Sequence, residues 1–153
     1  MPENMISATI DELPQLQGST FGPSDWRTVP QSEVDLYAQL SGDDNPIHVD
    51  ADFAAATPFG GRIAHGLLTV SVAVPLLRQV FRVTGMGMGI NYGMNRLRFP
   101  APVPAGSRIR IAGRVAEVTV IDGGLQATVV VEVEVEGNSK PACVAELVLR
   151  YYR

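Results

Sequence analysis

The sequence has little that could cross-link it, give it a large positive charge or carry it through a membrane. Cys143 is the only cysteine among 153 residues, which excludes an internal disulfide and fits a reducing cytosol best. Lys140 is the only lysine, and the formal net charge of −4 argues against a nucleic-acid-binding protein. The longest apolar segment, residues 66–81, falls short of the roughly 20 residues that cross a bilayer, and residues 1–15 lack the basic and apolar regions expected of a signal peptide. These absences predict a cytoplasmic globular protein with no membrane or nucleic-acid partner.

The length and composition predict one folded domain over residues 1–153. A chain of this size buries enough surface to fold without disulfides or metals. Its residues are 46% hydrophobic and 18% charged, which is typical of globular proteins. Residues 1–24 form an extension with little periodicity, in which a short helix is expected over residues 8–13.

Helices are expected in the first half of the chain and strands in the second, because the apolar period changes from about 3.6 to 2. The helices are expected over about residues 31–40, 51–56 and 66–83, after a short strand over 25–29. The helix over 66–83 is apolar on nearly all sides, so we expect it to be buried, with a kink at Pro75.

Four strands are expected over about residues 87–99, 108–120, 125–136 and 142–152. The alternation slips near Ala116, which predicts a β-bulge, and residues 122–124 predict a hairpin turn. Cys143 alternates with apolar residues in the last strand and is interpreted as a small core residue. Helices followed by antiparallel strands predict an α+β fold in which a curved sheet wraps one central helix.

Both histidines and an Asp-rich turn lie between residues 41 and 68, beside the start of that helix. Asp43 and His48 are separated by a turn containing Asn45 and Pro46, so both side chains could point at one water molecule. A carboxylate beside an imidazole is suited to proton transfer at neutral pH. A helix-capping Asp and a surface His explain the same spacing, and Asn45 is expected to brace the turn.

A metal site is a competing hypothesis for these residues, with His48, Asp50, Asp52 and His65 as ligands. The segment lacks the ligand spacing of an EF-hand, and the chain has few histidines and cysteines for zinc. We therefore expect no metal, and Asp50 is expected to cap the helix over 51–56.

Gly66 is expected to open the buried helix, where the first amides lack partners within the helix. A substrate carbonyl oxygen could approach its N–H closely, which is how an oxyanion site is built. The alternative is that Gly66 only permits tight packing of the helix. His65, beside it, is interpreted as structural rather than catalytic.

These residues resemble the (R)-specific enoyl-CoA hydratase family, the hydratase 2 or MaoC-like branch of the hot-dog fold. The motif consists of Tyr37, Leu40, Ser41, Gly42, Asp43, Asn45, Pro46, Ile47, His48 and Ala54. The resemblance continues through Phe59, Ala64-His65-Gly66, Asn91-Tyr92-Gly93 and the segment from Arg98 to Val103. It covers most of the chain from about residue 25 and is close to the short single-hot-dog hydratases of mycobacteria.

The resemblance implies a hot-dog homodimer in which two five-stranded sheets join, with two active sites near the interface. It implies an acyl-CoA thioester as substrate and no cofactor. Asp43 and His48 would activate a water molecule, and the amide of Gly66 would bind the oxyanion. The substrate-binding residues it implies are Asn45, Arg98, Phe99 and Pro100. Nearby arginines that could meet the CoA phosphates are Arg96, Arg98, Arg108, Arg110 and Arg114.

The implied reaction is the reversible hydration of a trans-2-enoyl-CoA to an (R)-3-hydroxyacyl-CoA. One alternative is a hot-dog thioesterase, which usually carries a catalytic carboxylate on the long helix. The other is a non-catalytic acyl-CoA-binding subunit of a dehydratase. The long helix here has no Asp or Glu, and both Asp43 and His48 are present, so the sequence favours an active hydratase.

Overall fold

The computed structural model describes residue 2 and residues 4–153. The early elements are β1 (Ile6–Thr9), the 3-10 helix η1 (Leu13–Leu16), β2 (Thr20–Phe21), β3 (Arg27–Thr28), α1 (Gln31–Ser41), α2 (Pro46–Val49) and α3 (Ala51–Ala55). The later elements are α4 (Gly66–Val80), β4 (Phe81–Thr84), β5 (Met88–Arg98), β6 (Arg108–Ile121), β7 (Gly124–Val135) and β8 (Cys143–Tyr152).

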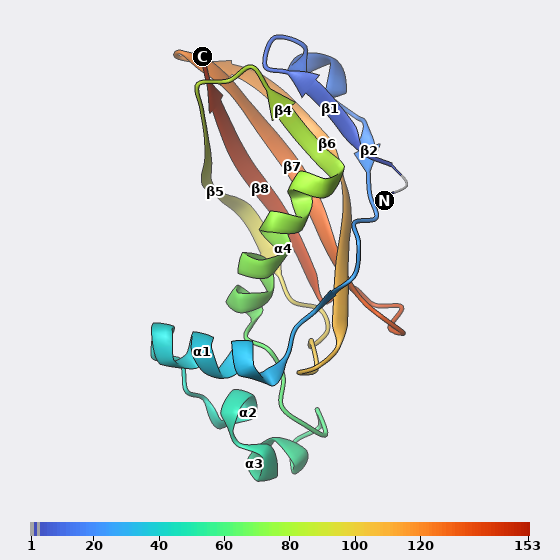
Figure 1. The fold of residues 1–153 in the computed structure, drawn as a ribbon, viewed down its shortest axis with the longest axis vertical. Helices are drawn as coiled ribbons and strands as arrows, with labels where there is room; N and C mark the ends of the chain where they lie inside the picture. Colours follow the sequence, from blue (N-terminus) through green and yellow to red (C-terminus); the bar gives the residue numbers. More distant parts are fainter. Residues whose placement is uncertain (1, 3) are drawn as a thin grey trace.

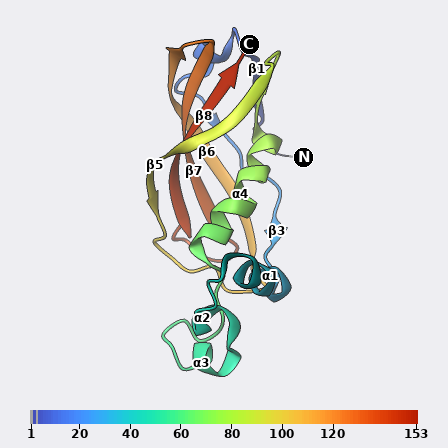
Figure 2. The same ribbon diagram turned by 90° about the vertical axis from the view of Figure 1, so that its left-hand side faces the viewer.

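A curved antiparallel sheet lies against the central helix α4, as the sequence predicts. The strand order is β2-β6-β7-β8-β5, and β3 also pairs with β6. The sheet has six strands where five were expected, because two short strands, β2 and β3, both pair with β6. Each of them is two residues long. Helix α4 lies across one face of the sheet, and α1, α2 and α3 gather beyond its N-terminal end (Figures 1 and 2).

The expected irregularities of the sheet are confirmed. The register of β6 against β7 shifts between Val115 and Glu117, beside the predicted slip at Ala116. The β6–β7 hairpin turns at Asp122 and Gly123, where Gly123 has a φ of 75° that favours glycine.

Two helix predictions are wrong: the helix expected over residues 8–13, and the C-terminal end of the helix expected over residues 66–83. Residues 8–13, expected to be helical, instead hold the end of β1 and the start of η1. Helix α4 ends at Val80 rather than continuing to residue 83, and Phe81–Thr84 forms β4. β4 pairs in parallel with β1, from Ile6 opposite Phe81 to Thr9 opposite Thr84. The pairing supplies main-chain hydrogen bonds from a distant segment, and local periodicity cannot reveal such a partner.

Helix α4 is not buried on all sides within this chain, contrary to the expectation. Leu67 is 55% exposed, and Ser71, Pro75 and Arg78 are exposed on the same side of the helix. Strand β5, at the edge of the sheet, is also exposed along nearly its whole length. Its large exposed apolar side chains are Met88, Ile90, Tyr92 and Met94. An exposed edge strand with large apolar side chains is typical of a surface that another chain covers.

Over the part of the chain that the structure describes, none of the helices has the length and the apolar character needed to cross a bilayer.

Cys143 is a core residue, as expected, and is 1% exposed. Burial raises the pKa of its thiol from 9.0 to about 11, because the thiolate is disfavoured away from water. We therefore expect native protein at about pH 8 to resist alkylation by iodoacetamide, since the thiolate is the nucleophile. Mass spectrometry should show one adduct only after the protein is unfolded in guanidinium chloride. Rapid labelling of native protein would contradict the packing of β8.

Candidate active site

The turn after α1 places Asp43 beside the start of α4. Gly42 ends α1 with a φ of 80°, a left-handed conformation that glycine adopts without strain, and its N–H donates to the carbonyl oxygen of Ala38. The Asp43 N–H then donates to the hydroxyl of Ser41 over 3.1 Å. The Asp43 side chain is exposed, so its carboxylate meets solvent.

The short helix α2, which periodicity did not predict, carries His48. Asn45 caps it, because its Oδ1 accepts a hydrogen bond from the N–H of Ile47 over 3.2 Å, and Pro46 occupies the first helical position. Asn45 therefore braces the turn as expected, and its role toward substrate stays a prediction. His48 is 7% exposed and is not the surface histidine of the alternative interpretation.

A main-chain carbonyl fixes the tautomer of His48. Its Nδ1 lies 2.7 Å from the carbonyl oxygen of Ile63, which can only accept, so Nδ1 carries the proton. The neutral ring is then left with an unprotonated Nε2. That nitrogen can accept a proton or a hydrogen bond from a water molecule.

His65 links the Asp43 turn to the start of α4. Its Nε2 lies 2.9 Å from the main-chain carbonyl oxygen of Asp43, and its ring is 2% exposed. The ring stacks on His48 with a centroid distance of 3.8 Å and also contacts the ring of Tyr37 at 4.8 Å. The interpretation of His65 as structural fits these contacts. No sequence pattern indicated that it holds the main chain of Asp43.

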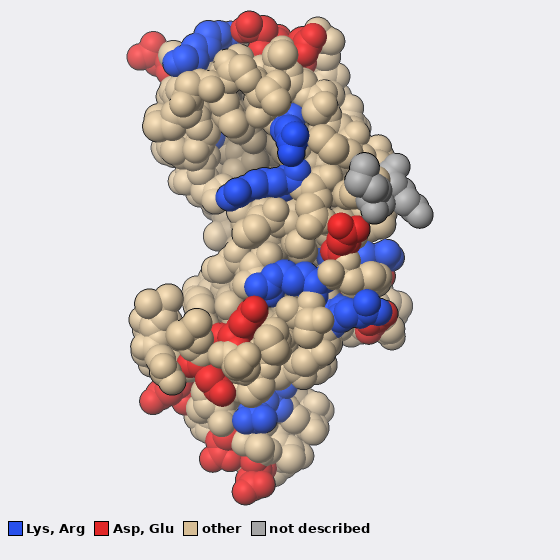
Figure 3. Space-filling view, viewed as in Figure 1, with Lys and Arg blue, Asp and Glu red and all other residues tan. Residues whose placement is uncertain are grey.

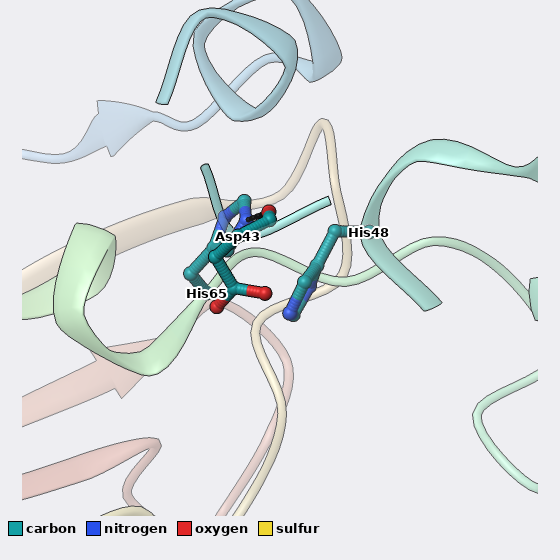
Figure 4. A group of neighbouring side chains, drawn as sticks. All are labelled: Asp43, His48 and His65. Carbon is teal, nitrogen blue, oxygen red and sulfur yellow. Dashed lines mark hydrogen bonds between the residues drawn. The ribbon is translucent and has the colours of Figure 1, made fainter. Parts of the chain in front are cut away.

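The three ionisable side chains lie together (Figure 4). One carboxylate oxygen of Asp43 and one ring nitrogen each of His48 and His65 lie within 4.8 Å of one another. This is not the metal-ligand set that the sequence offered. Asp50 instead caps α3 by accepting from the N–H of Phe53 over 2.9 Å. Nε2 of His65 donates to the carbonyl oxygen of Asp43, so that nitrogen has no lone pair left for an ion.

Gly66 begins α4, and no described side chain caps this helix. A Cβ atom at residue 66 would lie 2.6 Å from the nearest atom of the Phe99 ring. The alternative interpretation, that Gly66 permits tight packing, is therefore supported, because the Phe99 ring packs directly against Gly66. Phe99 is 43% exposed, so its ring is not locked in the core. The oxyanion role of the Gly66 amide stays a prediction.

A cavity of about 290 Å³ opens at this helix end. Its walls include His48, Gly66, Thr69, Phe99 and Pro100. Besides His48, three residues predicted for catalysis or substrate binding thus line this cavity: Gly66, Phe99 and Pro100. Asp43 and Arg98 are not among the lining residues, although a carboxylate oxygen of Asp43 lies within 4.8 Å of a ring nitrogen of His48.

Two of the five arginines predicted near the CoA phosphates are engaged elsewhere. Arg110 forms an ion pair with Glu134 at 2.7 Å, and Arg108 pairs with Glu136. Both guanidinium groups also lie over the ring of Trp26, at 5.8 Å for Arg108 and 4.3 Å for Arg110. These contacts hold the two arginines on the sheet surface.

Comparisons with known proteins identify relatives that match most of this chain. The chain is 48% identical over 144 residues to 3-hydroxyacyl-thioester dehydratase Z of Mycobacterium tuberculosis, with 94% of this chain and 95% of that protein covered. It is 33% identical over 141 residues to the (R)-specific enoyl-CoA hydratase of Rhodospirillum rubrum, with 90% and 92% covered.

Solved structures show the same architecture. R-hydratase PhaJ1 from Pseudomonas aeruginosa superposes with a TM-score of 0.71 at 26% identity, covering 90% of this chain and 82% of that chain. A family model described as a MaoC-like domain matches residues 12–138. The resemblance seen in the motif is thus confirmed, and the chain belongs to the MaoC-like dehydratases, a family of hydro-lyases with the hot-dog fold.

Proposed function

We propose that this protein catalyses the reversible, (R)-specific hydration of a trans-2-enoyl-CoA to an (R)-3-hydroxyacyl-CoA. The names of the relatives, a 3-hydroxyacyl-thioester dehydratase and an (R)-specific enoyl-CoA hydratase, support an acyl thioester as the substrate. The observation that carries the proposal is the convergence of Asp43 and His48 beside the Gly66 end of α4.

In this proposal one water molecule is held between the Asp43 carboxylate and Nε2 of His48. Asp43 takes a proton from the water as its oxygen forms a bond to C3 of the substrate. The π electrons of the C2–C3 bond move toward the thioester carbonyl, and the pair returns a proton to C2 through His48. The tautomer set by Ile63 supports this arrangement, because it leaves Nε2 as an acceptor for the water.

Negative charge develops on the thioester oxygen in the transition state. The N–H groups at the start of α4 and the helix dipole favour that charge, and Gly66 supplies the nearest amide. The Phe99 ring must move aside or stack on the thioester for this contact to form, since it packs against Gly66. The proposal therefore gives Phe99 a place in substrate binding.

A spectrophotometric assay tests the proposed reaction. We expect loss of enoyl absorbance with trans-2-enoyl-CoAs of several chain lengths, and chiral analysis should find only the (R)-3-hydroxy product. An (S)-product, or no hydration at any chain length, would contradict the proposal.

Two further measurements separate the alternatives. A thioesterase would release free CoA thiol, which a thiol-reactive dye detects, but α4 offers no Asp or Glu for that reaction. A non-catalytic subunit would bind acyl-CoA in calorimetry without turning it over.

We also propose that two copies pair through β5, as the resemblance implies. The exposed apolar side chains of this edge strand, together with the exposed Leu67 of α4, support the pairing. Sedimentation equilibrium should give about twice the chain mass of 16.4 kDa. Met94→Lys, on β5, should shift the equilibrium toward the single chain. Val120→Lys adds the same charge at an exposed apolar residue near the β6–β7 turn and should leave the mass unchanged. A wild-type mass of 16.4 kDa at micromolar concentration would exclude the pairing.

A further inference from the structure

His65 contacts both residues to which the proposed mechanism assigns proton transfer. Its Nε2 lies 2.9 Å from the main-chain carbonyl oxygen of Asp43, a contact that the dashed line in Figure 4 marks. Its ring stacks on the ring of His48, with a centroid distance of 3.8 Å and an interplanar angle of 28°. One residue at the start of α4 thus touches both members of the proposed pair.

The ring of His65 is enclosed by protein rather than by solvent. It is 2% exposed, and the ring of Tyr37 lies 4.8 Å from it at an interplanar angle of 54°. The acidic side chains at this end of the molecule lie on the surface instead, and Figure 3 shows several of them in the lower part of the face drawn. The orientation of the His65 ring is therefore set by its contacts with Asp43, His48 and Tyr37.

The hydrogen bond to Asp43 fixes where His65 carries its proton. A carbonyl oxygen can only accept, so Nε2 of His65 donates. Its Nδ1 is buried and has no hydrogen-bond partner among the residues that the structure describes. A proton on Nδ1 would place a positive charge and a second N–H group there without an acceptor from these residues, which costs free energy. His65 is therefore neutral, and its tautomer is opposite to that of His48, whose Nδ1 carries the proton.

A neutral neighbouring ring suits the role proposed for His48. Because His48 relays a proton in the hydration step, its ring carries a positive charge for part of the reaction. The face of a neutral aromatic ring attracts a nearby cation, whereas a second protonated imidazole would repel it. The stack also restricts rotation of the His48 ring, which preserves the orientation set by the carbonyl oxygen of Ile63.

We propose that His65 is a positioning residue that acts on the proposed pair through two separable contacts. Its hydrogen bond fixes the main chain of Asp43. Its neutral, stacked ring orients His48 and favours the charge that His48 carries during the reaction. The inference rests on the proposed function, because it takes the roles of Asp43 and His48 from the hydration reaction. It assigns no contact with the substrate to His65.

Three variants separate the two contacts. His65→Gln keeps an N–H near the position of Nε2 without a ring, His65→Phe keeps a ring without a donor, and His65→Ala removes both. We measure kcat and KM with crotonyl-CoA at a temperature where circular dichroism shows every variant folded. Because small displacements of reacting groups cost up to about 100-fold in rate, we expect kcat to fall about 100-fold in His65→Ala and about 10-fold in each of the other two. KM should stay close to the wild-type value.

Leu13→Ala is the control for a general loss of stability. Leu13 is 0% exposed and lies in η1, at the opposite end of the molecule from α1, α2 and α3 (Figure 1). Removing part of a buried side chain should lower the unfolding temperature. Both kcat and KM should keep their wild-type values, because Leu13 contacts neither member of the pair.

Heteronuclear NMR of the imidazole rings in isotope-labelled protein gives a measurement that does not depend on turnover. The chain has two histidines, so the spectrum of His65→Gln assigns the signals of both. We expect the proton on Nε2 in His65 and on Nδ1 in His48. A proton on Nδ1 of His65, or on both of its nitrogens, would overturn the inference.

The kinetic results decide the role of His65 in the same way. Wild-type kcat in folded His65→Ala would overturn the inference, and so would a raised KM with unchanged kcat, which indicates substrate binding instead. Equal losses of kcat in the three variants would show that the two contacts are not separable. Absent turnover by the wild type would contradict the hydration proposal, and the NMR signals would still decide the contacts of His65.

Discussion

Asp43→Asn is expected to abolish turnover of crotonyl-CoA while the protein stays folded. An amide can still hold the water but cannot take its proton, and loss of a general base typically costs 10²- to 10⁴-fold in rate. The side chain is exposed and makes one long contact, 3.5 Å from the N–H of Asn45, so the fold should hardly respond. The measurement is kcat for hydration, with thermal unfolding recorded in parallel.

The neighbouring residue supplies the control for this variant. Asp44 is also exposed and lies on the same turn, so Asp44→Asn makes the same chemical change one residue away. We expect it to keep wild-type activity. Near wild-type hydration by Asp43→Asn would show that the carboxylate has no catalytic role.

His48 is tested in the same way with two variants. His48→Ala removes the whole ring and should abolish turnover. His48→Asn keeps an N–H close to the position of Nδ1, so the hydrogen bond to the carbonyl oxygen of Ile63 can persist while Nε2 is lost. Both variants are expected to be inactive, and His48→Asn should be the more stable of the two. Activity retained by His48→Asn would remove Nε2 from the mechanism.

The second large effect is expected at Gly66. In Gly66→Ala the new methyl group would lie 2.6 to 2.8 Å from three ring atoms of Phe99, so the ring must shift toward the cavity. The methyl group also stands beside the amide that we propose for the oxyanion. Loss of one oxyanion donor costs about 10²- to 10³-fold in kcat, and a loss of at least about 100-fold is expected here.

A double variant separates the two roles of Gly66. Gly66→Ala with Phe99→Ala relieves the contact with the ring, so thermal stability should recover relative to Gly66→Ala alone. Turnover should stay low if the amide needs open space for the thioester. Full recovery of activity would mean that Gly66 serves only the packing of Phe99. Gly61→Ala, where an added Cβ meets no described atom within 4 Å, is the matched glycine control.

Part of the fold could be predicted because its signals are local. The bulge of β6 near Ala116 and the turn at Gly123 follow from side-chain alternation and turn chemistry within a few residues. The same holds for α1 and for Asp50 as the cap of α3. By contrast, the apolar residues of β4 continue the apolar run of α4, so periodicity could not separate them.

The candidate site also combines features that local sequence signals predict with features that they do not. The motif predicted that Asp43 and His48 meet across a turn, and a carboxylate oxygen of Asp43 lies within 4.8 Å of a ring nitrogen of His48. The sequence did not indicate that His65 holds the Asp43 carbonyl, or that Ile63 orients His48. These contacts join residues 22 and 15 positions apart through main-chain oxygens, which have no residue-specific signature.

The amino-acid sequence by itself determined the strand pattern, the central helix and the set of residues that carry the proposed chemistry. These depend on side-chain type and short-range spacing, which one chain displays directly. Only the tertiary structure decided the tautomer of His48 and the position of the Phe99 ring against Gly66. Each of these depends on distances between segments that are remote in sequence, and such distances are set when the sheet closes around α4.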